Sequence, residues 1–95
     1  MSFSILLVFE KPDSSDLAAV ENWQRLSNKL QGVANNNKGT QLLGENCLLL
    51  PIDQGLEVFY DVVLCTRGVP YRYTTIPNEA IRWLEKKEGV WVYHS

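Results

Sequence analysis

The stretch that decides the fold is residues 47–70, CLLLPIDQGLEVFYDVVLCTRGVP. Its first four residues form a short apolar run, which is typical of a strand covered on both faces. Beyond Pro51, four apolar residues recur at helical spacing and predict an amphipathic helix that runs to about Arg67: Leu56, Phe59, Tyr60 and Val63. A strand that leads into such a helix predicts a compact sandwich of helices on a sheet.

The expected helix has recognisable signals at both ends. Asp53 can accept hydrogen bonds from the backbone amides of the first turn, so it is the expected N-cap. Gly68 is the expected left-handed residue at the other end, and Pro70 prevents the helix from resuming. Residues 71–76, YRYTTI, are rich in β-favouring side chains and predict a further strand.

The N-terminal half repeats this alternation of strand and helix. Residues 3–9, FSILLVF, predict an interior strand, and residues 34–39, ANNNKG, are expected to end the helix that follows it. That helix is predicted by six apolar positions at three- and four-residue spacing: Leu17, Val20, Trp23, Leu26, Leu30 and Val33. Residues 40–43 and 47–50 then predict a tight hairpin around residues 44–46, with a single bulged strand as the alternative.

The last nineteen residues fit two structures. Pro77 and Asn78, the polar stretch 79–88 and then Gly89 favour a short helix with a cap and a stop. Residues 81–85 and 90–94 can instead pair as a hairpin, which would bring Trp83 and Trp91 together. We expect the helix, and in either case the run 90–93 needs a partner strand because its side chains are costly to leave in water.

The order strand, helix, strand, strand, helix, strand predicts an α+β fold, a ferredoxin-like two-layer sandwich with a short C-terminal helix or hairpin extension. The 95 residues are expected to form one domain, 1–95. Because the expected strands are so apolar, the sheet face without helices should be covered by the C-terminal segment or by a second subunit. The expected partner is a second copy, joined through sheet faces or through the edge at residues 90–93.

Composition limits the classes of partner. The chain has 9 basic and 11 acidic residues, and a net charge of −2 disfavours binding to RNA or other polyanions. The N-terminal apolar run is too short for a secretory signal or a membrane span, so we expect a cytoplasmic protein without a membrane partner. Cys47 and Cys65 each lie in an apolar run, which favours buried free thiols over a disulfide.

Catalytic and metal-binding motifs are absent from the sequence. His94, the one histidine, is next to the last residue, where no fixed neighbour orients its ring. A single histidine and two separated cysteines give no metal-ligand spacing, so no metal or cofactor is expected. The carboxylates have structural roles as strand end, N-cap and helix surface: Glu10, Asp53, Glu57 and Asp61. We therefore expect no catalytic residue.

The order of elements resembles that of the CRISPR-adaptation endoribonuclease-like family and the related VapD-type toxins, which are small ferredoxin-like dimers. The resemblance covers most of the chain, in the order of elements only. These families have an acidic residue, usually aspartate, at the end of the first strand, where this chain has Phe9 and Glu10. The resemblance implies Glu10 as a nuclease-type acid, although the surrounding motif is absent.

Aromatic residues are the remaining feature. Tyr71 and Tyr73 share one side of their strand, as do Trp91 and Tyr93, and we expect these four side chains to form an interaction surface for a second copy or a protein partner. Non-enzymatic protein interaction or oligomerisation is therefore the expected function. One alternative is an RNA-binding or nuclease-like module in which the aromatics stack on bases. The other is a regulatory domain that binds a small molecule at a dimer seam.

Overall fold

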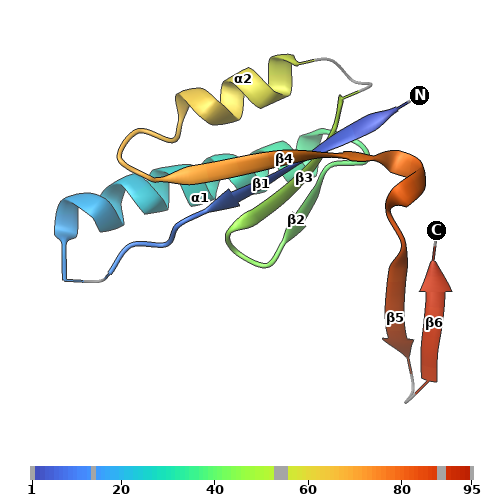
Figure 1. Ribbon diagram of the computed structural model, residues 1–95. Coiled ribbons are helices and arrows are strands. Elements are labelled where there is room, and N and C mark those ends of the chain that lie inside the picture. The colour runs from blue at the N-terminus through green and yellow to red at the C-terminus, as the bar shows by residue number, and fades with distance from the viewer. Residues whose placement is uncertain (1, 14, 53–55, 88–89, 95) are drawn as a thin grey trace.

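The computed structural model describes residues 2–13, 15–52, 56–87 and 90–94, and it describes side chains as far as residue 83. The elements in chain order are β1 (Phe3–Phe9), α1 (Leu17–Asn36), β2 (Gln41–Leu43), β3 (Cys47–Pro51), α2 (Glu57–Leu64), β4 (Tyr71–Pro77), the 3₁₀ turn η2 (Asn78–Ala80), β5 (Trp83–Lys87) and β6 (Val90–His94) (Figure 1). The first six elements follow the predicted order.

Four of the strands form one antiparallel sheet in the order β2-β3-β1-β4. Strand β1 is interior, as its apolar sequence predicted, and Leu7 lies between Leu48 of β3 and Tyr73 of β4. Strands β2 and β3 pair around residues 44–46, with Gly44 in the left-handed region (φ 72°), so the predicted hairpin is confirmed and the single bulged strand is wrong. A four-stranded antiparallel sheet with two helices confirms the α+β class.

Both helices pack on the sheet face that carries the odd-numbered residues of β1. The buried core there consists of Ile5, Leu7, Phe9, Trp23, Leu26, Leu30, Val33, Leu48, Val62 and Val69. Helix α1 supplies four of its predicted apolar positions to this core, but Leu17, its first residue, is 77% exposed. The spacing therefore predicted the helix through Leu17 correctly, but a spacing pattern cannot show where the helix extends past the sheet that it covers.

Side chains set the ends of α1. The Asp16 carboxylate accepts from the backbone amides of Ala18 and Ala19 at 3.1 and 3.2 Å. At the other end the helix continues to Asn36, further than the asparagine-rich run predicted. Asn37 ends it, since both its backbone amide and its side-chain amide donate to the carbonyl of Val33 (3.1 and 2.9 Å).

Helix α2 differs from its prediction in length and in its buried face. It begins after Leu56, which makes no side-chain cap, and the predicted cap Asp53 lies outside the described residues. The helix stops at Leu64 rather than near Arg67, and Gly68 has the predicted left-handed conformation (φ 78°) within the turn that follows.

The buried positions of α2 are Val62, which is fully buried, with Val58, Phe59 and Cys65 packed against the core. Leu56 and Tyr60, which the spacing placed on one apolar face with Phe59, are 48% and 61% exposed. The physical reason is that α2 carries apolar side chains on most of its circumference. The spacing pattern therefore fits more than one stripe, and contact with the sheet selects between them.

The C-terminal helix prediction is wrong, and the alternative of a hairpin is confirmed, although its first strand is Trp83–Lys87 rather than residues 81–85. Strands β5 and β6 form a separate two-stranded sheet that projects from the rest of the molecule (Figure 1). This pairing supplies the partner strand that residues 90–93 need. Trp83 lies opposite His94, and Trp91 lies opposite Lys86, so the two tryptophans are not cross-strand partners.

The apolar strands predicted a large exposed apolar area on the sheet face without helices, but part of this face is covered. Ser4 is buried on this face, and its hydroxyl donates to the side-chain carbonyl of Asn78 (2.5 Å), while the Asn78 amide donates to the carbonyl of Ser2 (2.9 Å). The segment after β4 thus covers one end of the face. Leu6 and Val8 are half-buried there, and among the described residues the most exposed large apolar side chains lie on other surfaces.

Candidate interaction surface

Strand β4 is an edge of the sheet, and the hydrogen bonds at its two ends show which of its residues face outward. The Glu10 amide donates to the carbonyl of Pro70 and the Asn78 amide to that of Ser2, both at 2.9 Å. Antiparallel strands bond through alternate pairs, so the even-numbered residues of β4 bond to β1. The N–H and C=O groups of Tyr71, Tyr73 and Thr75 therefore project away from the sheet.

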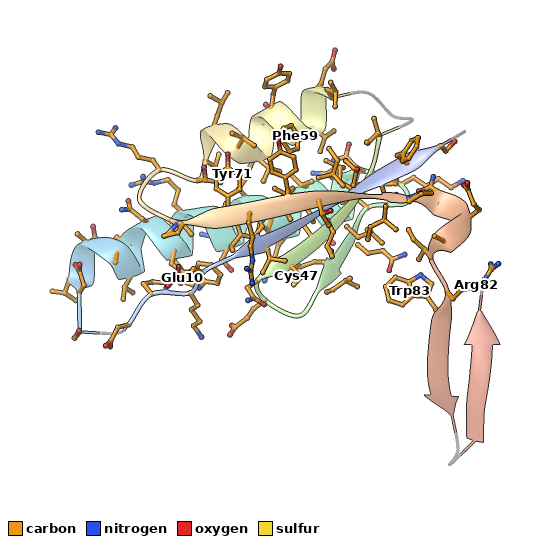
Figure 2. All side chains as sticks on the ribbon, in the orientation of Figure 1. Glu10, Cys47, Phe59, Tyr71, Arg82 and Trp83 are labelled. Carbon is orange, nitrogen blue, oxygen red and sulfur yellow. The ribbon has the colours of Figure 1, made fainter. Side chains whose placement is uncertain are left out.

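The side chains of the two tyrosines lie at the same edge, on the side of the sheet that the helices cover. The Tyr73 ring meets that of Phe59 edge-on at a centroid distance of 5.4 Å, and the Tyr71 ring lies 6.2 Å from that of Phe9. Figure 2 shows Tyr71 and Phe59 on the α2 side of β4. Tyr73 remains 56% exposed, so the packing orients its ring and leaves an accessible surface.

Helix α2 continues this surface. Leu56, Tyr60 and Leu64 follow one another at four-residue spacing, and all three are exposed, Leu64 to 79%. In Figure 1 α2 lies along β4 at the same side of the molecule. We call the set Leu56, Tyr60, Leu64, Tyr71 and Tyr73 the α2–β4 surface. We take this set as the candidate interaction surface, because groups of exposed large apolar side chains mark interaction sites.

The sequence predicted part of this surface. Tyr71 and Tyr73 were named as interface candidates, and the structure brings them together on β4. Leu56 and Tyr60 were predicted only as part of the apolar face of the helix. The signal that could have placed them outside is the second stripe on the helix, which Leu64 completes at four-residue spacing.

The other two interface candidates belong to a different sheet. Trp91 and Tyr93 lie in β6, whose backbone pairs with β5 and not with the four-stranded sheet. Their side chains lie outside the described residues. The interface role of Trp91 and Tyr93 therefore stays a prediction.

Glu10, the candidate nuclease-type acid, lies at the end of β1 beside a shallow cavity of about 500 Å³. The cavity is lined by Val8, Phe9, Glu10, Lys11, Asn46, Pro70, Tyr71 and Arg72. Glu10 is the one carboxylate of this lining. Lys11, which also lines the cavity, is paired with Glu45 at 2.9 Å. Within the described part of the chain, no three histidine, cysteine, aspartate or glutamate side chains gather as a metal site.

The geometry of Arg72 bears on base stacking. Arg72 is next to both tyrosines in sequence, but alternation along β4 directs it to the opposite face of the sheet. Tyr73 packs on a helix rather than on an open sheet face. A stacking platform needs aromatic rings on an uncovered face with cations beside them, so this arrangement favours apolar contact over nucleic-acid binding.

Two further expectations concern cysteines and membranes. Cys47 and Cys65 are free thiols, each half-buried rather than fully buried. Within the described residues, the helices are too short or too polar to cross a lipid bilayer.

Comparisons of the chain with protein-family models, with curated proteins and with solved structures found no match.

Proposed function

We propose that this protein is a small interaction module that self-associates through the α2–β4 surface and does not catalyse a reaction. The observation that carries the proposal is the coincidence of two features at one edge. Strand β4 projects backbone donors and acceptors outward, and the apolar side chains of β4 and α2 that flank this edge are exposed.

Each feature favours association for its own physical reason. An edge strand offers a ready template for another strand, because its outward N–H and C=O groups have no partner within the sheet. Burial of an exposed leucine or tyrosine side chain at the contact stabilises the complex by about 1.5–3 kcal/mol. Tyrosine is also enriched at protein interfaces.

The fold that supports this surface is, in our proposal, the ferredoxin-like sandwich. The element order βαββαβ, the sheet order β2-β3-β1-β4 and the placement of both helices on one face support it. In this arrangement β4 and β2 are the two edges. Because β2 has three residues and β4 has seven, β4 is the edge with room for a partner.

The test is light scattering coupled to size exclusion on the purified chain and two matched variants. Leu64→Lys places a charge on the α2–β4 surface. Leu17→Lys places the same charge on α1, at a side chain of nearly equal exposure (77% against 79%). We expect a dimer that Leu64→Lys dissociates and Leu17→Lys preserves. A wild-type monomer at all attainable concentrations would refute self-association, and equal effects of the two variants would refute the surface.

The cavity at Glu10 supports a second candidate, a nucleic-acid-processing role. Glu10 and Arg72 line the same cavity, so a carboxylate and a guanidinium are available to one ligand. Such an enzyme would cleave RNA in the presence of Mg²⁺ or Mn²⁺ and lose that activity in Glu10→Gln without unfolding. Equal, background-level cleavage by wild type and variant would exclude it.

A further inference from the structure

We propose that the occupant of the β4 edge is a second copy of this chain, paired strand to strand and antiparallel, with Tyr73 on the two-fold axis. This inference rests on the self-association proposed above and adds the identity of the paired strands and their register. Tyr73 of one copy faces Tyr73 of the other, and Tyr71 of each copy faces Thr75 of its partner. The four-stranded sheets of the two copies then form one continuous sheet across the contact.

The outward backbone groups favour this register over its neighbours. The donors that project from β4 belong to Tyr71, Tyr73 and Thr75, and a two-fold axis at Tyr73 places each of them opposite another member of the set. If the partner strand is shifted by two residues in either direction, one of these three residues no longer faces another of the three. A shift toward Pro77 also gains no donor, because proline has no N–H.

The position of α2 fits the same axis. Phe59 packs against Tyr73, so the middle of α2 lies next to the residue on the axis. A two-fold operation there places the two α2 helices side by side and antiparallel on one face of the joined sheet.

The charges of β4 are compatible with self-pairing. Arg72 is the one charged residue between Tyr71 and Pro77, and its side chain leaves the strand on the face opposite to the tyrosines. In the proposed register Arg72 of one copy faces Thr74 of the other, so the two guanidinium groups do not meet. Strand β4 also has no proline before its last residue and no lysine, which are common means of preventing edge pairing.

Disulfide trapping tests the register directly. In a chain whose native cysteines are replaced by Cys47→Ser and Cys65→Ser, the variant Tyr73→Cys places two thiols across the axis. Facing residues of a hydrogen-bonded antiparallel pair have Cα atoms about 5.5 Å apart, within the range that a disulfide spans. Thr75→Cys is the matched control, since two copies of this residue would lie about 14 Å apart along the strands.

We expect a covalent dimer from Tyr73→Cys under mild oxidation and none from Thr75→Cys. Because Tyr73→Cys removes a ring from the surface, the double variant Tyr71→Cys/Thr75→Cys provides a second trap that retains Tyr73, and it should also crosslink. If light scattering shows a dimer while neither trap closes, or while Thr75→Cys alone crosslinks, the register is refuted and self-association stands. In that case the pairing of β5 or β6 with the β4 of another copy becomes the next hypothesis. A monomer would refute both proposals.

Discussion

Leu26 and Leu17 belong to the same helix and the same spacing pattern, but the structure predicts opposite consequences for their truncation. Leu26 is fully buried, whereas Leu17 is 77% exposed. Truncation of a buried leucine to alanine removes its transfer free energy and leaves a cavity, at a cost of about 2–5 kcal/mol. A chain of this length has a free energy of unfolding of about 5–14 kcal/mol. Leu26→Ala should therefore remove a large part of it, and Leu17→Ala should change it by less than about 0.5 kcal/mol.

The assay is urea unfolding followed by far-ultraviolet circular dichroism, at one fixed protein concentration because self-association couples stability to concentration. At about 4–8 °C per kcal/mol for a domain of this size, Leu26→Ala should also lower the thermal midpoint by on the order of 10–40 °C. A cost below about 1 kcal/mol for Leu26→Ala would refute the assignment of this side chain to the core. So would an equal cost for the two variants.

Three further predictions concern a helix cap, two turn glycines and one side-chain hydrogen bond, and each is measured as the change in the urea midpoint. Asp16→Ala should cost about 1 kcal/mol because two amides lose their acceptor, while Asp16→Asn, which also caps, should cost much less. Gly68→Ala and Gly44→Ala should each cost about 1–2 kcal/mol for the positive φ. The cost should be larger at Gly68, whose added Cβ would collide with the Asn22 side chain, and Asn22→Ala should remove that excess. Ser4→Ala should cost about 1–3 kcal/mol, since it leaves a half-buried carbonyl without its donor; no change would show that water replaces the hydroxyl.

The N-terminal half of the fold could be predicted from sequence because its local signals agree. The apolar run of β1 and the long stripe of α1 each permit one structure, and the glycine turn between β2 and β3 favours a hairpin over a single bulged strand. The stripe of α1 extends over several turns, so its direction is well determined even though Leu17 lies outside the core. In such segments the local conformational preference and the tertiary packing favour the same structure.

The second half was predicted less well because its local signals permit several structures. Helix α2 has eight residues and few polar ones, so the choice of buried face depends on the sheet rather than on the sequence. Residues 79–88 contain both helix-favouring charges and the strand-favouring Ile81 and Trp83, and the pairing of β5 with β6 decides between helix and strand. The α2–β4 surface follows from these two decisions, which is why only Tyr71 and Tyr73 were found in advance.

The central position of β1 has a consequence for how this chain reaches its native state during synthesis. Strand β1 is made before both of its neighbours, and Leu7 pairs with Tyr73 across most of the length of the chain. While β3 and β4 are still to be translated, the most apolar strand has no sheet to join, and α1 has no complete face to cover. Folding of this kind, dominated by distant contacts, is slow. A nascent chain that has passed α1 but not β4 is therefore the stage at which chaperone binding or misassociation would be most frequent.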